Sequence, residues 1–116
     1  MKYNSVKTIY KGIKYDSKAE AKYAMILEDL LNQKKLKKVE PQVAFPLENM
    51  EGKKRLRYVV DFVATDNNDN VHYLEVKGQL TPANVVKMSY CQFVYGIKIT
   101  LIPTTGTRAF DTSWLD

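Results

Sequence analysis

Two short apolar runs carry ionisable side chains where a buried strand would otherwise be uniformly apolar. Residues 73–78 predict a strand in which Glu75 and Lys77 share one face, because successive side chains of a strand alternate between its two faces. Residues 58–63 predict a second strand, and Asp61 lies inside it. A carboxylate and an ammonium on one face, beside an aspartate of a neighbouring strand, are suited to binding a metal ion and a phosphate group.

The same three groups also allow a structural interpretation. Lys77 can pair with Asp61 or Glu75 as a buried ion pair whose only role is to hold the strands together. Such pairs contribute little net stability, because the cost of removing the charges from water offsets their attraction. The residue types therefore favour chemistry over structure, and both interpretations stay open.

The candidate ligands are oxygen atoms. The chain has one histidine, His72, and one cysteine, Cys91, so neither a disulfide nor a zinc-finger spacing is available. Cys91 lies among aromatic residues and is expected to be a small buried side chain. Carboxylate oxygen suits Mg²⁺ or Mn²⁺ better than zinc, and we therefore expect Mg²⁺ as the cofactor, with Mn²⁺ able to replace it.

Composition limits the class of protein and its partners. A chain of 116 residues with 45% hydrophobic residues suits one globular domain, residues 1–116, with a single modest core. Eighteen basic against thirteen acidic residues give a formal net charge of +5, which favours nucleic acid as a partner. No run approaches the length of a membrane span and no signal peptide is visible, so we expect a cytoplasmic protein without a membrane partner.

The first long helix is expected to begin at Ser17. Ser17 and Glu20 have the spacing of a capping box, and apolar residues then recur at helical spacing to about residue 33. Glu20 lies four residues before Ala24 and seven before Leu27, so it continues the inward face of this helix. A carboxylate there is costly unless a positive group is near. Capping and projection into a cleft both explain Glu20, and the two roles are compatible.

Three strands, a second helix and a last strand should follow. The strands are predicted at residues 39–47, 56–65, 71–78 and 97–102, with a turn at 66–70 and a helix at 82–95 between the last two strands. Pro41 and Pro46 predict that the first strand lies at an edge of the sheet or bends. A helical crossover makes the last two strands parallel.

Side-chain alternation and periodicity also predict which residues face inward. In the second strand, one face should hold Arg57, Val59, Asp61 and Val63, and the other Tyr58, Val60 and Phe62. In the second helix, the inner face should lie near Val85, Val86, Ser89, Phe93 and Val94.

The two ends of the chain are less regular. Residues 1–15 form either a loose basic arm or a short hairpin of residues 6–10 against 13–15, which is either a plain surface segment or an arm that touches a nucleic-acid backbone. Residues 104–116 form an irregular tail, in which Trp114 is expected to pack back onto the body.

The order αβββαβ, together with these charged residues, resembles the PD-(D/E)XK nuclease superfamily. Asp61 matches the family's aspartate, with Val60 in place of the proline, and Glu75-Val76-Lys77 follows fourteen residues later as (D/E)XK. The likeness covers about residues 15–103. The Ser-x-x-Glu, Tyr-x-x-Asp-Phe and Glu-x-Lys-Gly patterns look closest to phage endonuclease I-like Holliday junction resolving enzymes.

This resemblance implies a fold, a site and an activity. The fold is a restriction-endonuclease-like α/β (α+β) core, a central mixed sheet flanked by helices. Asp61, Glu75 and the Val76 backbone carbonyl would bind Mg²⁺, with Glu20 joining directly or through water, and Lys77 would act on the attacking water and the phosphate. The implied activity is hydrolysis of phosphodiester bonds in branched DNA by a phage or prophage endonuclease, usually a homodimer.

Further residues and alternatives complete the prediction. The expected DNA-binding residues are basic side chains in the first 22 residues, around the second strand and on the second helix: Lys14, Lys18, Lys22, Lys53, Lys54, Arg55, Arg57 and Lys87. Gln42 is either a polar neighbour of the metal or a solvated strand residue. Two other functions stay open: a restriction-like, nicking or repair nuclease of the same fold, and a DNA-binding module that does not cut.

Overall fold

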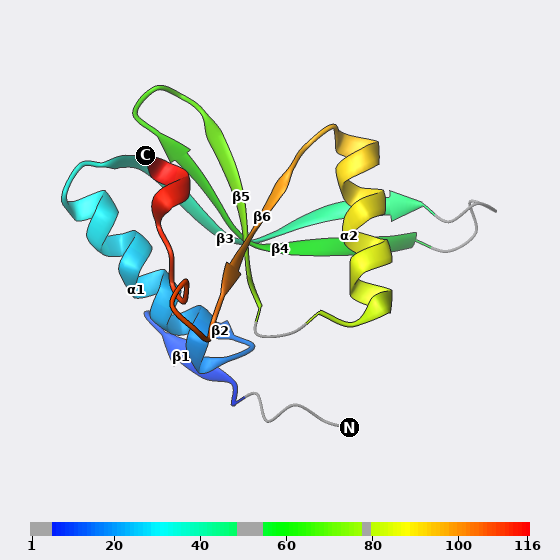
Figure 1. The fold of residues 1–116 in the computed structure, drawn as a ribbon, viewed down its shortest axis with the longest axis horizontal. Helices are drawn as coiled ribbons and strands as arrows, with labels where there is room; N and C mark the ends of the chain where they lie inside the picture. The colour runs from blue at the N-terminus through cyan, green and yellow to red at the C-terminus, as the bar shows by residue number, and fades with distance from the viewer. Residues whose placement is uncertain (1–5, 49–54, 78–79) are drawn as a thin grey trace.

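The computed structural model (Figure 1) describes residues 6–48, 55–77 and 80–116. Its elements, in chain order, are β1 (Thr8–Tyr10), β2 (Ile13–Tyr15), α1 (Lys18–Asn32), β3 (Leu36–Glu48), β4 (Arg55–Asp66), β5 (Val71–Lys77), α2 (Pro82–Tyr95), β6 (Ile99–Pro103) and the short 3-10 helix η1 (Ser113–Leu115). The predicted order αβββαβ is confirmed, and a hairpin precedes it. None of the helices in these ranges is long and apolar enough to cross a membrane.

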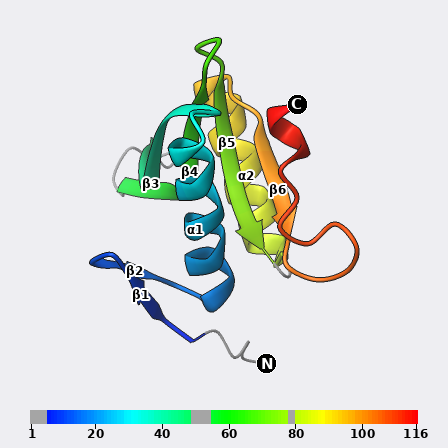
Figure 2. The same cartoon turned by 90° about the vertical axis from the view of Figure 1, so that its left-hand side faces the viewer.

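The central sheet is mixed, as predicted. Its strands lie in the order β3-β4-β5-β6; β3, β4 and β5 pair antiparallel, and β6 pairs parallel with β5. Strand β3 is an edge strand, which is where a strand that contains Pro41 and Pro46 can be tolerated. Helices α1 and α2 cover opposite faces of the sheet (Figures 1 and 2), so the protein is an α+β sandwich with two apolar layers.

Each face of the sheet has its own buried cluster. On the α1 face, Tyr23 and Leu27 pack against Phe62 and Leu74. On the α2 face, the buried residues are Leu47, Tyr58, Val60, Val63, Met88, Cys91 and Ile99. Cys91 is fully buried among these apolar side chains, as expected.

Local signals in the sequence explain where both helices begin and where α2 ends. The Ser17 hydroxyl accepts a hydrogen bond from the Glu20 backbone N–H at 3.1 Å, and the Thr81 hydroxyl accepts one from Asn84 at 3.2 Å. These contacts satisfy N–H groups that a helix start leaves without intrahelical partners. Gly96, with φ of 64°, ends α2 in the left-handed conformation that glycine adopts without strain.

The predicted faces of β4 are wrong beyond Asp61. Tyr58 and Val60 belong to the α2 cluster, but Phe62 belongs to the α1 cluster and Val63 to the α2 cluster. The alternation therefore resets at Asp61. There the ladder between β4 and β5, which runs from Thr65↔Val71 to Phe62↔Leu74, comes to an end.

A distortion in β3 lies opposite this point. The pairs Pro41↔Phe62 and Val43↔Val60 set Gln42 across from Asp61, and Gln42 has a φ of 52°. A residue other than glycine in the left-handed region costs about 1 kcal/mol or more. The sheet thus bends at Gln42 and Asp61, and regular alternation does not hold across the bend.

The predicted inner face of α2 is also wrong. Phe93 is 85% exposed and Val86 is 70% exposed, and Val85, Ser89 and Val94 are exposed as well. The residues that α2 buries against the sheet are Met88 and Cys91. The helix carries two apolar stripes, and the richer one faces away from the sheet.

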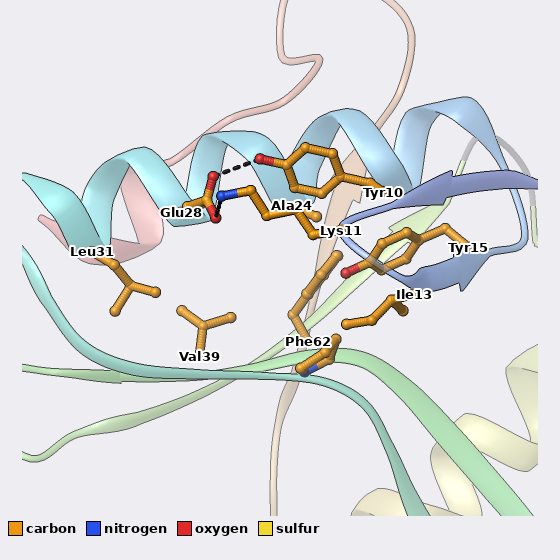
Figure 3. A pocket seen from close by; sticks show the side chains of 10 residues that line it. Tyr10, Lys11, Ile13, Tyr15, Ala24, Glu28, Leu31, Val39 and Phe62 are labelled. Atoms are coloured by element: carbon orange, nitrogen blue, oxygen red, sulfur yellow. Dashed lines mark hydrogen bonds and ion pairs between the residues drawn. The ribbon is translucent and has the colours of Figure 1, made fainter.

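The N-terminal segment takes the hairpin alternative, with Thr8 opposite Tyr15 and a turn at Gly12. Glu28 of α1 holds this hairpin: it accepts a hydrogen bond from the Tyr10 hydroxyl at 2.5 Å and forms an ion pair with Lys11 at 2.6 Å (Figure 3). Beneath these contacts lies a cavity of about 250 Å³, lined mainly by apolar side chains of the hairpin, α1, β3 and β4.

The C-terminal tail packs onto the body, as predicted for Trp114. The Trp114 indole donates to the Tyr23 hydroxyl at 2.7 Å, and that hydroxyl donates to the Asp111 carbonyl at 2.7 Å. The Trp114 ring also lies 5.0 Å from the His72 ring, measured between centroids. The tail therefore closes the end of the α1 layer.

The turn between β4 and β5 gives a test of stability against pH. Asp66 accepts hydrogen bonds from the backbone N–H groups of Asn68 and Asn70, at 2.9 and 3.0 Å, and its carboxylate lies 2.9 Å from the His72 ring nitrogen. These contacts, of which the one with His72 has the largest effect, hold the pKa of Asp66 below its usual 3.8. The stabilisation is present above pH 3.8 and is lost as the pH falls through the folded-state pKa. We expect Asp66→Asn to lower Tm at neutral pH, and the deficit to shrink below pH 3.8.

The matched control is Asp69→Asn in the same turn, whose side chain is exposed. Thermal melts followed by circular dichroism across an acid series would check this. A deficit for Asp66→Asn that stays constant with pH would contradict it.

Candidate active site

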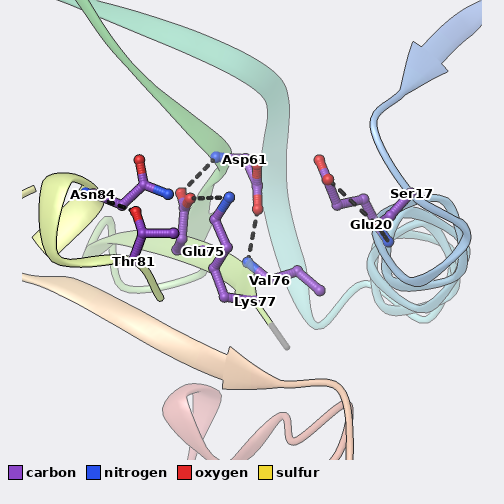
Figure 4. A network of polar contacts seen from close by, with 8 residues as sticks. All are labelled: Ser17, Glu20, Asp61, Glu75, Val76, Lys77, Thr81 and Asn84. Atoms are coloured by element: carbon purple, nitrogen blue, oxygen red, sulfur yellow. Dashed lines mark hydrogen bonds and ion pairs between the residues drawn. The ribbon is translucent and has the colours of Figure 1, made fainter. Parts of the chain in front are cut away.

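Two carboxylates lie where β4 and β5 separate (Figure 4). Asp61 accepts a hydrogen bond from the Val76 backbone N–H at 2.7 Å, and Glu75 accepts one from the Asp61 backbone N–H at 3.4 Å. The ladder of backbone bonds ends one residue away, at Phe62↔Leu74. The carboxylates therefore take backbone donors that the separating strands leave free, and this fixes their positions relative to each other.

Lys77 lies on the same face of β5 as Glu75, as the strand alternation predicts. Its Nζ is 3.6 Å from Glu75 Oε2, and its side chain is 34% exposed, whereas that of Glu75 is 3% exposed. The ion pair that the structural interpretation requires is thus present. The ammonium group nevertheless reaches solvent, and the carboxylate beneath it does not.

Glu20 joins these residues from the first turn of α1. Its side chain is buried and extends toward Asp61 (Figure 4), and its carboxylate lies 3.4 Å from the Ser17 hydroxyl. Of the predicted capping box, the structure shows the Ser17 hydroxyl accepting from the Glu20 backbone N–H, while the Glu20 carboxylate lies beside that hydroxyl and faces the cluster. The sequence thus correctly brings Glu20, Asp61, Glu75 and Lys77 together.

Nearby positive groups do not balance the negative charge that the cluster has when its three carboxylates are ionised. Burial raises the pKa of Glu20 and of Glu75. Burial, followed by the charges of Glu75 and Glu20, raises the pKa of Asp61 to about 9. The hydrogen bond from the Val76 N–H and the charge of Lys77 act in the opposite direction on Asp61. Among the described residues, Lys77 is the one cation within 4.0 Å of these carboxylates. Three buried carboxylates share one lysine, an arrangement that is costly without further positive charge.

Two residues near the cluster were not predicted as site residues. The buried Tyr58 side chain lies near Glu75, and burial, followed by the charge of this carboxylate, raises the pKa of Tyr58. Asp16 lines the cleft beside Glu20 and pairs with Lys7 at 3.0 Å. The Tyr-x-x-Asp-Phe pattern contains Tyr58 and could have identified it as a site residue. No sequence pattern indicated Asp16.

The four groups line an open cleft of about 350 Å³. Lys14 and Arg57 line it as well, and an adjoining pocket of about 290 Å³ brings Lys87 and Asn84 beside Glu75 and Lys77. Three of the predicted DNA-binding residues, Lys14, Arg57 and Lys87, are therefore at the site.

The other predicted DNA-binding residues are not at the cleft or lie outside the described structure. Lys18 is exposed on the first turn of α1 and does not line the cleft, and Lys22 lies over the Phe110 ring at 5.4 Å. Lys53 and Lys54 lie outside the described residues, as does the side chain of Arg55.

Gln42 has a definite place at the cleft. It is exposed and lines the cleft opposite Asp61, and its side-chain amide donates to the Lys14 carbonyl at 2.7 Å. Gln42 therefore ties the hairpin to the bend in β3 and holds Lys14 at the rim. Both earlier interpretations of this residue are partly met, because it is solvated and also near the carboxylates.

The donor set suits a hard divalent cation. The available atoms are carboxylate oxygens, with one lysine beside them; His72 packs against Trp114, and Cys91 lies in the α2 cluster. Within the described residues, no three His, Cys, Asp or Glu side chains converge closely enough to form a metal site. Asp61 and Glu75, which are joined through backbone N–H groups, are the two carboxylates that could hold such an ion, and Glu20 faces them from α1.

The excess of buried carboxylates predicts that Asp61 lowers the stability of the folded chain in metal-free buffer. Because the pKa of Asp61 rises from 3.8 to about 9 on folding, the folded chain keeps a proton that the unfolded chain loses between these values. Stability should therefore fall as pH rises through this window in metal-free buffer. We expect Asp61→Asn, which keeps an acceptor for the Val76 N–H, to raise Tm at about pH 8 with chelator present, and Asp16→Asn to leave it nearly unchanged. A Tm of Asp61→Asn at or below that of the wild type would contradict this.

Comparison with known proteins places the chain in a family. No curated protein and no solved structure matches it. A family model described as "Protein of unknown function (DUF1064)" matches residues 1–104, which include every element from β1 to β6 and all four residues of the carboxylate and lysine cluster. The chain therefore belongs to the DUF1064 family.

Proposed function

We propose that this protein is a Mg²⁺-dependent endodeoxyribonuclease of the PD-(D/E)XK type. The observation that carries the proposal is the cluster of three buried carboxylates, Glu20, Asp61 and Glu75, beside one half-exposed lysine in an open cleft. Three buried carboxylates beside one lysine destabilise the fold unless a further positive charge offsets them. Perturbed carboxylates in a cleft are typical of catalytic sites, and a divalent cation would offset their charge.

Each residue has a distinct task in this proposal. Asp61, Glu75 and the Val76 carbonyl would hold the metal ion, and Glu20 would join them directly or through water. Such an ion would lower the pKa of a bound water and offset negative charge on the phosphate. Lys77 orients the attacking water and donates to the phosphate oxygen as negative charge develops there. The backbone N–H groups of Asp61 and Val76 hold the carboxylates of Glu75 and Asp61 in place.

DNA is the proposed substrate because of the charge around the cleft. The chain has a formal net charge of +5, and Lys14, Arg57 and Lys87 surround the carboxylates at its rim. Branched DNA is the substrate class that the resemblance to phage Holliday junction resolving enzymes implies. On the same ground we propose a phage or prophage origin, action in the host cytoplasm and a homodimeric enzyme.

A second candidate is a DNA-binding module that does not cut. The Lys77–Glu75 ion pair and the absence of a converged three-residue ligand group in the described residues favour it. The two candidates differ in what Mg²⁺ does: a nuclease needs it for turnover, whereas a module binds DNA without it.

Cleavage assays separate the two candidates. We expect wild-type protein to cut DNA with Mg²⁺ or Mn²⁺ and not with Ca²⁺ or chelator. Lys77→Ala and Asp61→Ala should each lower the rate by about 100-fold or more while DNA binding persists, because they remove transition-state contacts and a metal ligand. The matched control is Lys35→Ala, at an exposed lysine in the turn between α1 and β3. A panel of linear, nicked and four-way substrates would show which DNA is cut, and binding without metal-dependent cleavage of any of them would favour the module.

Binding to DNA should depend on the cations at the rim. Arg57→Ala or Lys87→Ala should weaken binding by a similar factor on every sequence and reduce the slope of log K against log salt by about 1, because each removes one phosphate contact. Lys35→Ala is again the control. Fluorescence anisotropy over a salt series would measure this, and an unchanged slope for both variants would place the DNA elsewhere on the protein.

A further inference from the structure

The outer face of α2 is apolar, exposed and uncharged. Pro82, Val86, Ser89 and Phe93 recur at spacings of four, three and four residues, so they form one stripe along the helix. Flanking this stripe are the exposed side chains of Val85, Tyr90 and Val94. We call these seven residues the α2 outer face.

The contacts that attach α2 to the sheet do not use the centre of this face. Met88 and Cys91 are buried, and the hydroxyls of Tyr90 and Tyr95 donate to the carbonyls of Glu48 and Pro46 in β3, at 2.9 and 2.6 Å. Phe93 and Val86 remain 85% and 70% exposed. The described part of the chain therefore leaves the most apolar stripe of the helix exposed to a contact with another molecule.

The extent and charge of the face indicate what can cover it. Its exposed side chains offer on the order of 500 Å² of mostly apolar surface, near the upper end for a patch on a monomer and enough for the centre of an interface of roughly 800 Å² per partner. Lys87 is the one charged residue of α2, and it lies at the pocket beside Glu75 and Lys77, away from this stripe. A polyanion gains nothing here, whereas two copies can meet on this face without bringing like charges into contact. The net charge of +5 on each copy opposes the pairing only at longer range, where salt screens it.

We propose that the α2 outer face pairs with the same face of a second copy of this chain. An antiparallel pairing about a two-fold axis near Ser89 sets Phe93 of each copy against Val86 of the other, and the small Ser89 side chains let the helices approach closely. The large ring of Phe93 lies on one side of Ser89 and the branched Val86 side chain on the other, so the face is complementary to itself. The pairing needs neither metal nor DNA, so it stands apart from the proposed nuclease activity.

The mass of the protein in solution tests this pairing. We expect wild-type protein to sediment at twice 13.4 kDa at micromolar concentrations, and Phe93→Asp to raise the dimer dissociation constant by about 100-fold or more. Because the Phe93 side chain is 85% exposed, the substitution should not disturb the fold of the single chain, and the variant monomer should have the same Tm as the wild-type monomer. Met25→Asp, at a half-exposed methionine on α1, is the matched control and should stay dimeric.

A cross-link tests the orientation independently. Ser89→Cys should form an intermolecular disulfide under mild oxidation, whereas Asn68→Cys in the β4–β5 turn should not; the native Cys91 is buried and does not interfere. A wild-type mass of 13.4 kDa throughout, or a dimer that survives Phe93→Asp, would overturn the proposal. The first result would assign the face to a different partner, and the second would place the dimer contact elsewhere. Loss of nuclease activity has no bearing on either measurement.

Discussion

The structure depends on the point where β4 and β5 separate. At Asp61 the backbone ladder stops, and the N–H groups of Asp61 and Val76 donate to carboxylates instead of carbonyls. A buried N–H without a partner costs about 1–3 kcal/mol, so the carboxylates are needed there as acceptors even though their burial is unfavourable. Position and charge are thus coupled: the groups that could bind a metal ion also complete the sheet.

This separation also gathers residues from both faces of the sheet at one place. Helix α1 contributes Glu20 and helix α2 contributes Lys87, although the two helices pack on opposite faces. The bend at Gln42 connects the hairpin to the same cleft through the Lys14 carbonyl. A flat, regular sheet would keep the two sets of residues apart. The left-handed Gln42 and the interrupted ladder are therefore local costs that bring the charged groups together.

Predictions succeeded where the signal is local and failed where it depends on pairing. The starts of α1 and α2 at Ser17 and Thr81, the parallel β5–β6 pair and the grouping of Glu75 with Lys77 follow from short-range spacing. The reset of alternation at Asp61 does not, because it arises from which strands pair on either side of it. Asp16 reaches the site through the same long-range geometry, and no short motif contains it. Tyr58 belongs to the Tyr-x-x-Asp-Phe pattern, but its position near Glu75 also depends on how the strands pair.

The misassigned face of α2 has a different cause, which is itself informative. Periodicity identifies the more apolar stripe of a helix and assumes that the chain's own core covers it. Here the core covers Met88 and Cys91, and the stripe with Phe93 and Val86 is exposed. Since apolar surface on one stripe is unfavourable in water, its position outside the core is explained if another molecule covers it. Because Lys87 of the same helix lies at the cleft, a pairing through α2 would hold two clefts rigidly in one assembly, which suits a substrate with two opposed strands.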